Sequence, residues 1–241
     1  MIVMPANNTN AYALAEQYPG RIGMMFSPDG WKAQEKVPYV LDNGRFVLLG
    51  DPSAEWDEAK WRKLLDSAAD HYTQPEWIAV PDMPGDADET LRLWDHWHYH
   101  LTRDYPEWRF AYVVQDGATP EAVPENADVI FIGGTTRWKR KSLWGWCHKQ
   151  GRPVHVGRIN TECWLWECHR AGAQSCDGTG WYRGDKKQLA GLHRYLDRSS
   201  RGLTVPQLEL EFAATFTPEP DDFVAAVTSF RKMKWDVHEH L

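Results

Sequence analysis

Several short apolar segments of this chain are followed by polar residues that could handle a purine base and its glycosidic bond. The most informative is Gly172-Ala-Gln-Ser-Cys-Asp177, in which a single carboxylate follows a run of small and apolar residues. A carboxylate in that position commonly caps the next helix or opens a turn. It can also act as a nucleophile on a sugar carbon when a second carboxylate flanks the same bond. Which interpretation holds depends on what the other segments carry.

The other segments add carboxylates, an amide, glycines and a histidine. They are Leu41-Asp42-Asn-Gly44-Arg-Phe46, Pro81-Asp82, Gln115-Asp116-Gly117, Gly133-Gly134 and His155-Val-Gly157-Arg158. Each has a structural explanation by itself, because Asp, Asn and Gly are the residues that turns prefer. Together, Asp and Gln suit the Watson–Crick edge of a purine, a glycine pair admits an exocyclic oxygen, and Phe46 could stack on a planar ring. The set therefore predicts a site for a nucleobase and its glycosidic bond.

Bringing these residues together requires a fold in which strand ends converge. We expect strands at residues 21–26, 39–41 with 46–49, 77–80, 110–114, 129–132, 154–156 and 173–176. We expect helices at residues 53–69, 86–102, 138–150, 161–171, 185–198 and 221–234. Strand–helix alternation predicts a parallel sheet, and the lack of GxGxxG after the first strand favours a closed barrel over a doubly wound sheet. The predicted fold class is α/β, a single (β/α)8 TIM-like barrel over residues 1–241, with the site at the carboxyl ends of its strands.

Composition and charge narrow the class of protein. The 42% of hydrophobic residues suits a globular core, and most of the 14 tryptophans should pack within it, with a minority free to stack on bases. The net charge of −7 argues against a protein that coats polyanions, although basic segments at 137–141, 183–187 and 194–201 could form either a local nucleic-acid surface or solvated helix faces. The four cysteines form no CxxC pair, and neither a metal nor a cofactor is predicted. Without a long apolar run, the chain is expected in the cytoplasm, that of the host if a phage encodes it, and not in a membrane.

In their order along the chain, these segments resemble the tRNA-guanine transglycosylase superfamily, and within it the DNA-guanine transglycosylases of phage and bacterial DNA-modification systems. Asp42 and Phe46 keep the spacing of the family's DSGG-aromatic-Gln motif, although one glycine and the glutamine are missing here. The other matching segments are Asp82 for the second base-binding aspartate, Gln115-Asp-Gly117 for the Gln-Gly segment, Gly133-Gly134 for the base-recognition turn, Gly172 with Asp177 for the nucleophile motif, and Arg183 for the arginine that follows it.

The resemblance implies a pentosyltransferase that replaces guanine in DNA with a 7-deazaguanine such as 7-cyano-7-deazaguanine. Asp177 would be the nucleophile that forms a covalent intermediate with the sugar, and Asp42 the general acid/base. Base binding would fall to Asp82, Gln115, Gly133 and Gly134, with Phe46 stacking on the base. A contact to phosphate, or support of the site from behind, is expected of His155, Arg158, Lys139 and Arg183.

One departure from the family concerns zinc. The tRNA enzymes carry a CxCxxC…His zinc site after the nucleophile, whereas this chain has no cysteine beyond Cys176. The zinc subdomain is therefore expected to be absent, which favours DNA over tRNA as the substrate.

Three other functions stay open: a nucleic-acid or nucleoside N-glycosidase on the same barrel, a tRNA-acting transglycosylase, and a non-catalytic barrel that binds nucleic acid. Because the net charge predicts weak affinity of the chain for a duplex, a helper protein is expected to deliver the substrate.

Overall fold

The computed structural model describes residues 1–6, 10–33, 36–49, 53–149, 151–182 and 186–203. Residues Met1–Ser200 form one compact unit, which contains every element discussed below. The second unit, Arg201–Leu241, lies almost entirely outside the described residues, and so does the helix predicted at 221–234.

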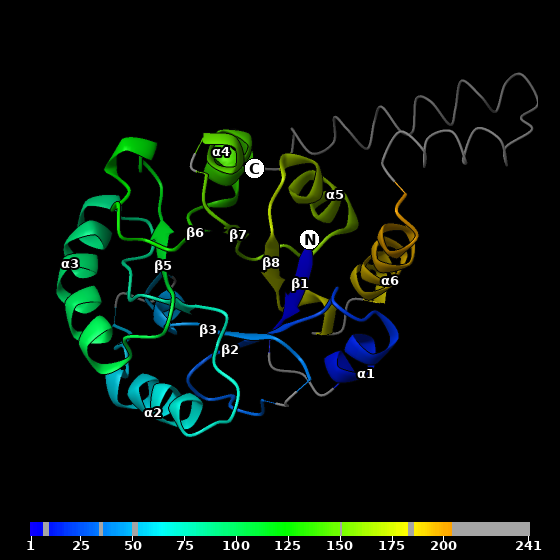
Figure 1. Cartoon of the computed structure of the whole chain (residues 1–241). Coiled ribbons are helices and arrows are strands. Elements are labelled where there is room, and N and C mark those ends of the chain that lie inside the picture. Colours follow the sequence, from blue (N-terminus) through cyan, green and yellow to red (C-terminus); the bar gives the residue numbers. More distant parts are fainter. Residues whose placement is uncertain (7–9, 34–35, 50–52, 150, 183–185, 204–241) are drawn as a thin grey trace, which may run out of the picture. The chain divides into compact units, whose positions relative to one another are not determined.

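Eight parallel strands form the centre of this unit. They are β1 Ile2–Pro5, β2 Met24–Phe26, β3 Tyr39–Leu41, β4 Ile78–Ala79, β5 Phe110–Val114, β6 Val129–Ile132, β7 Val154–Val156 and β8 Ser175–Gly178. Their order in the sheet is β1-β8-β7-β6-β5-β4-β3-β2, and every pairing is parallel. Parallel bridges from Val3 to Ile22 and from Ala6 to Met25 bring the two edges together, so the sheet curves into a nearly closed barrel (Figure 1). The predicted (β/α)8 TIM-like fold is thereby confirmed.

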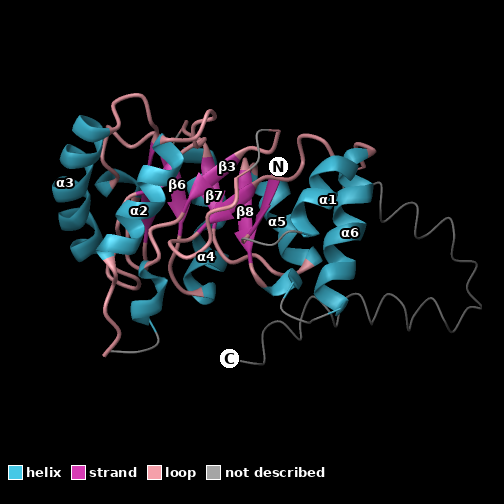
Figure 2. Ribbon diagram, turned by 90° about the horizontal axis from the view of Figure 1, so that it is seen from below, coloured by secondary structure: helices cyan, strands magenta, loops and turns pink. Residues whose placement is uncertain are grey.

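Helices alternate with these strands and surround them (Figures 1 and 2). They are α1 Asn10–Gln17, α2 Glu58–Ala69, α3 Ala87–Asp104, α4 Thr136–Lys149, α5 Glu162–Ala171 and α6 Lys186–Ser200, with short 3-10 helices η1 Arg45–Leu49, η2 Pro120–Ala122 and η3 Gly180–Tyr182. Side chains cap two of these helices: Asp86 accepts from the N–H of Glu89 at α3, and Thr161 accepts from the N–H of Trp164 at α5. Gly172, with a φ of 90°, ends α5 in the left-handed conformation that glycine favours.

Two of the sequence-based predictions of local structure are wrong. The second half of the split strand, residues 46–49, is the 3-10 helix η1, because the chain leaves the barrel wall after Leu41 and turns over its mouth. The helix predicted from Ser53 begins only at Glu58, because Asp57 accepts a hydrogen bond from the N–H of Lys60 and acts as the cap. The elements β1 and α1 were not predicted at all.

The barrel interior is apolar through most of its depth. A buried cluster joins Met4, Met25, Val40, Trp77, Ala79, Ala111, Val113, Val129 and Phe131. Side chains alternate between the two faces of a strand, so the next inward positions are those two residues further along. Asp42 follows Val40 in this way, Gln115 follows Val113 and Gly133 follows Phe131. The polar residues therefore form the uppermost layer of the barrel, above an apolar floor.

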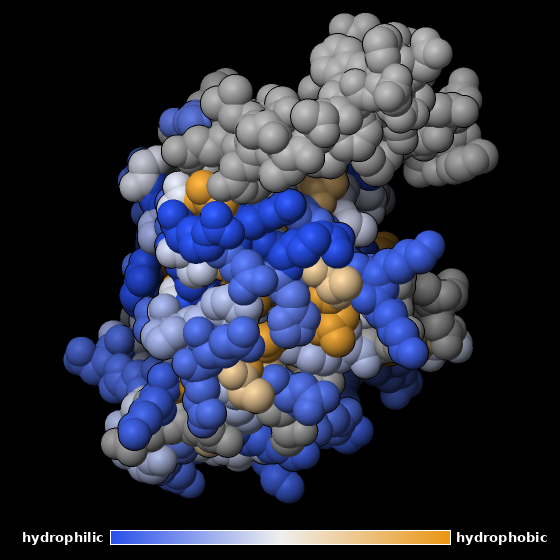
Figure 3. Space-filling view, turned by 90° about the vertical axis from the view of Figure 1, so that its right-hand side faces the viewer, coloured by the Kyte–Doolittle hydropathy of each residue, from blue (hydrophilic) through white to orange (hydrophobic). Residues whose placement is uncertain are grey.

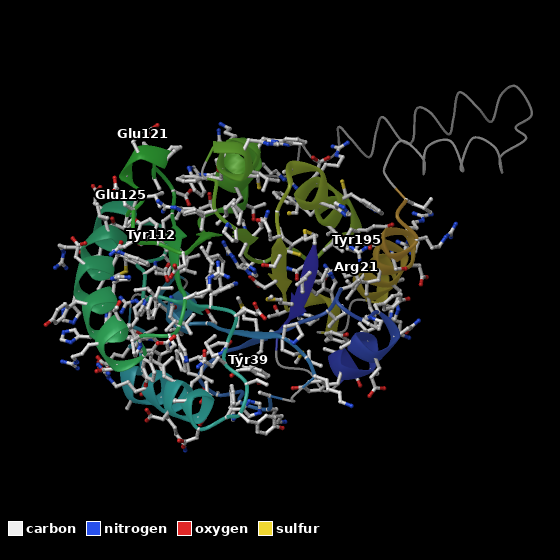
Figure 4. The ribbon with its side chains drawn as sticks, in the orientation of Figure 1. Arg21, Tyr39, Tyr112, Glu121, Glu125 and Tyr195 are labelled. Carbon is white, nitrogen blue, oxygen red and sulfur yellow. The ribbon has the colours of Figure 1, made fainter. Side chains whose placement is uncertain are left out.

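Aromatic side chains join the barrel to its helices. Tyr112 lies between β5 and α3, and its ring centroid is 5.4 Å from that of Trp94 (Figure 4). Tyr195 of α6 packs similarly on Trp166 of α5, at 4.9 Å. Most of the tryptophans on the helices are buried, as predicted, with Trp144 an exposed exception.

The outer surface beside α1 and α6 is mainly hydrophilic, with small apolar areas (Figure 3). In the part of the chain that the structure describes, every helix is too short or too polar to span a bilayer.

Candidate active site

A cavity of about 530 Å³, here called the main pocket, opens at the carboxyl ends of the strands. Its floor includes Met25, Val113 and Phe131 of the apolar cluster. Its wall contains these predicted site residues: Asp42, Phe46, Asp82, Gln115, Gly133, Gly134, Arg158 and Asp177. The structure thus brings together residues spread over much of the chain, at the face where barrel enzymes carry out their chemistry.

Asp177 is held at both of its oxygens. The backbone N–H of Arg158 donates to Oδ1 at 3.1 Å, and Nε2 of His155 lies 3.1 Å from Oδ2. The side chain is only 6% exposed and faces the main pocket. A carboxylate fixed in this way presents its remaining lone pairs to a substrate in one orientation.

His155 supports Asp177 from inside the barrel. Its ring is fully buried between Trp77 and Phe131, with centroids 4.8 and 4.7 Å away. Nδ1 lies 2.8 Å from the hydroxyl oxygen of Ser175. Because an ionised carboxylate only accepts, Nε2 carries the proton and Nδ1 accepts from Ser175. His155 therefore lies behind Asp177 and not on the surface of the main pocket.

Arg158 has an unusual backbone conformation at the point where its N–H contacts Asp177. Its φ of 60° makes it the one non-glycine residue with a positive φ among those the structure describes. Strain of this kind persists where the surrounding contacts enforce it, often in active sites. The guanidinium donates to the carbonyl of Gly134 and lies over the ring of Phe46, 4.5 Å from its centroid. Arg158 therefore connects three parts of the pocket wall.

Asp42 directly follows β3, three strand positions from Asp177 around the barrel. Its carboxylate is near the hydroxyl of Ser27, at 3.4 Å, and accepts from the N–H groups of Asn43 and Gly44. Burial raises the pKa of Asp42 to about 7, and the charges of Asp177 and Asp82 add to this rise. A carboxyl group with such a pKa can both give and take a proton near neutral pH.

Asp82 and Gln115 form a hydrogen-bonded network in the pocket wall. Asp82 accepts from Nδ2 of Asn43 at 2.8 Å and from Nε2 of Gln115 at 2.5 Å. Burial raises the pKa of Asp82, while these two hydrogen bonds act in the opposite direction. The oxygen of Gln115 accepts from the N–H groups of Gly85 and Gly134, each at 2.9 Å. Gln115 thus ties the loops after β4 and β6 together.

The two glycines after β6 already use their N–H groups within the protein. Gly133 donates to the carbonyl of Val114 at 3.0 Å, and Gly134 donates to Gln115. What these glycines provide directly is space. A Cβ at position 133 would lie 2.7 Å from Nε2 of Gln115, and one at position 134 would lie 2.6 Å from Oδ2 of Asp116.

Phe46 stands at the mouth of the pocket, 52% exposed, on η1. The preceding residue anchors this turn, because buried Arg45 donates to the carbonyl of Asp82 and lies over Trp56, 4.8 Å from the ring centroid. Trp56 in turn donates from Nε1 to the carbonyl of Asn43 at 2.8 Å. No local sequence pattern marks Trp56 as part of the site, whereas Asn43 and Arg45 belong to the segment 41–46 that predicts it.

Lys139 and Arg183 complete the predicted set. Lys139 is 1% exposed and donates to the carbonyl of Gly157 rather than facing the main pocket. Arg183 lies outside the described residues.

Comparison with known proteins does not place the chain in a family: no protein-family model matches it, and no curated protein matches its sequence. Within the described residues, no group of three or more His, Cys, Asp or Glu side chains is arranged to hold a metal ion.

Proposed function

We propose that this protein is a base-exchange glycosyltransferase that replaces guanine in DNA with a 7-deazaguanine derivative. One observation carries the proposal: two carboxyl groups line the main pocket in different surroundings. Asp177 is hydrogen-bonded at both oxygens, while the pKa of Asp42 is raised to about 7. In enzymes that act on glycosidic bonds, the nucleophile and the acid/base are typically two carboxyl groups that the protein surrounds differently.

In the first half-reaction, an oxygen of Asp177 attacks C1′ of the nucleotide. The C1′–N9 bond breaks as the new C1′–O bond forms, and protonated Asp42 gives its proton to the departing guanine. The products are free guanine, a sugar ester of Asp177 and ionised Asp42. Because the pKa of Asp42 is about 7, a large share of the molecules carry that proton at neutral pH.

In the second half-reaction, N9 of the incoming 7-deazaguanine attacks C1′ while its proton passes to Asp42. The C1′–O bond breaks, and Asp177 returns to its ionised form. Both half-reactions use the same two groups in opposite directions, which is the pattern expected for a covalent exchange.

The charges of the main pocket favour the insertion of a base rather than of the DNA backbone. Six carboxylates and two basic side chains line it: Asp29, Asp42, Glu55, Asp57, Asp82 and Asp177, with Lys60 and Arg158. Carboxylates accept hydrogen bonds from the N1–H and amino group of guanine, whereas they repel phosphates. A duplex substrate would therefore have to present its base flipped out of the helix.

The test is a trapping experiment on guanine-containing single-stranded DNA, with tRNA as a parallel substrate. Wild-type protein is expected to form a denaturant-resistant adduct with DNA, and Asp177→Asn is expected to form none. The matched control is Glu121→Gln, which removes one carboxylate far from the main pocket, on η2 (Figure 4). An adduct with tRNA alone would show that the substrate is tRNA and not DNA. An adduct that persists in Asp177→Asn would show that Asp177 is not the nucleophile.

Product analysis separates exchange from hydrolysis on the same barrel. With 7-cyano-7-deazaguanine present, an exchange enzyme incorporates it into the DNA. An N-glycosidase instead leaves an abasic site whether or not the free base is added. Neither product nor adduct with either nucleic acid would favour a non-catalytic barrel.

A further inference from the structure

A second, smaller cavity lies beside the main pocket, where α4 and α5 begin. This side cavity has a volume of about 160 Å³ and is lined by Thr136, Lys139, Arg158, Ile159, Asn160, Thr161 and Trp164. Its volume is about five times the 30 Å³ or so that a water molecule occupies in the liquid. Arg158 lines both cavities, so a ligand in one lies next to a ligand in the other.

The charge of the side cavity is opposite to that of the main pocket. Its lining contains two basic side chains and no carboxylate, whereas carboxylates dominate the main pocket. Lys139 and Arg158 supply this positive charge. The other polar groups of the lining are hydroxyls and an amide, which can donate hydrogen bonds to an anion.

Lys139 has no countercharge in contact with it. Its ammonium group donates to the carbonyl of Gly157, and it forms no ion pair with any carboxylate that the structure describes. Asp177 and Asp116 act on it only at longer range. Burial lowers the pKa of Lys139 to about 8, so the group still carries its proton at neutral pH in most molecules. Because a buried charge without a countercharge is costly, an anionic ligand would stabilise this arrangement.

The surrounding backbone favours the same charge. The 14-residue helix α4 begins at Thr136 and the 10-residue helix α5 follows its cap, Thr161, and both of these residues line the side cavity. The N-termini of helices carry partial positive charge and stabilise anions.

We infer that the side cavity binds a phosphate group of the nucleotide whose base occupies the main pocket. The assignment of the phosphate to that nucleotide rests on the proposed function, whereas binding of an oxyanion beside Lys139 does not. The consequence is that the enzyme acts on nucleotides within a nucleic acid and discriminates against free nucleosides.

The test compares equilibrium binding of 2′-deoxyguanosine 5′-monophosphate, 2′-deoxyguanosine and inorganic phosphate to the full chain by calorimetry at low salt. We expect the monophosphate to bind about tenfold to a hundredfold more tightly than the nucleoside, as for loss of a hydrogen bond to a charged group. Lys139→Met should abolish this preference without changing nucleoside affinity. Lys63→Met, which removes an exposed lysine of α2, controls for net charge.

A second variant guards against loss of folding in Lys139→Met. Asn160 accepts from the N–H of Gly180 at 2.8 Å, and Asn160→Asp keeps this acceptor while it adds a negative charge to the side cavity. It too should remove the preference for the monophosphate. Equal affinity of wild type for nucleoside and monophosphate, or a preference that survives in Asn160→Asp, would overturn the inference. These binding measurements need no turnover, so their result is independent of the trapping experiment. The side cavity can therefore be confirmed when no adduct forms, or refuted when an adduct does form.

Discussion

Nε2 of His155 lies 3.1 Å from Oδ2 of Asp177, and the imidazole reaches this oxygen from within the barrel rather than from the pocket. The nucleophile proposed here is therefore oriented by a side chain that no substrate touches. On the other oxygen, the N–H of Arg158 is aimed by a backbone conformation that costs energy. Two separate hydrogen bonds, one to each oxygen, thus hold this carboxylate in one orientation, as a rigid nucleophile requires.

Removal of the imidazole should slow the chemistry more than it weakens binding. His155→Phe fills the same space between Trp77 and Phe131 but leaves Oδ2 of Asp177 without its donor. The loss of one hydrogen bond to a charged group predicts a single-turnover rate of adduct formation lower by about tenfold to a hundredfold. The measurement is this rate together with the dissociation constant for the oligonucleotide, which should stay unchanged.

His155→Gln provides the matched control, because an amide retains an N–H donor. It should recover part of the rate that the phenylalanine variant loses. A rate that is equally low in both variants, with equal losses of thermal stability, would mean that His155 serves only the packing of the barrel.

Asp42→Asn should make the protein inactive and, at alkaline pH, more stable. The pKa of Asp42 is raised in the folded state, so the folded protein binds this proton more tightly than the unfolded chain. Stability from this group is therefore complete below about pH 4 and is lost as the pH rises through about 7. With a folded pKa of about 7, the asparagine variant should gain up to about 4 kcal/mol at pH 8 and little at pH 4. Urea unfolding at the two pH values measures this difference.

The pH dependence of adduct formation should also report the protonation of Asp42. The proposed first half-reaction needs Asp42 protonated, so the rate of adduct formation in wild type should fall as the pH rises through about 7. A rate that rises through this range would assign the acid role to another group.

Gln115→Glu should destabilise the protein in a pH-dependent manner. The amide nitrogen that donates to Asp82 at 2.5 Å is replaced by a carboxylate oxygen, while the acceptor for the N–H groups of Gly85 and Gly134 is kept. Two buried carboxylates in contact must share a proton, which raises the pKa of the pair further. The free energy of unfolding should fall by about 1–3 kcal/mol at pH 8 and by less at pH 5. Gln17→Glu, at an exposed position of α1, adds the same charge and should have little effect at either pH.

The sequence predicts the barrel well, because alternation of apolar runs and helical segments is a local property of the chain. It also predicts which residues meet at the mouth, since parallel strands place their carboxyl ends on one face. The apolar pattern of residues 46–49 predicts a strand, because it fits a buried run equally well. Only the contacts of Arg45 with Asp82 and Trp56, which are distant along the chain, define them as a turn.

Lys139 shows a second limit of the sequence. A lysine in a basic segment is normally a solvated residue, and the segment at 137–141 gives no local sign that one member is buried. Lys139 is buried because α4 packs against the loop after β7. There its ammonium group donates a hydrogen bond to the carbonyl of Gly157. The same long-range packing decides that His155 faces inward, toward Asp177.

Gly157→Ala should disturb Asp177 although it adds a single methyl group. A Cβ at this position would lie 2.6 Å from Cε2 of Phe131 and 3.3 Å from Oδ2 of Asp177, inside the barrel. Relief of such a contact requires shifts in a packed interior, so the free energy of unfolding should fall by about 1–3 kcal/mol. Since the carboxylate of Asp177 is one of the two groups displaced, adduct formation should also slow.

Gly145→Ala on α4, where a Cβ would meet nothing within 4 Å, should instead stabilise the helix by about 0.5–1 kcal/mol and leave adduct formation unchanged. Thermal and urea unfolding with adduct kinetics on both variants would decide the matter: a stable, fully active Gly157→Ala protein would show that the glycine is not required beside Asp177.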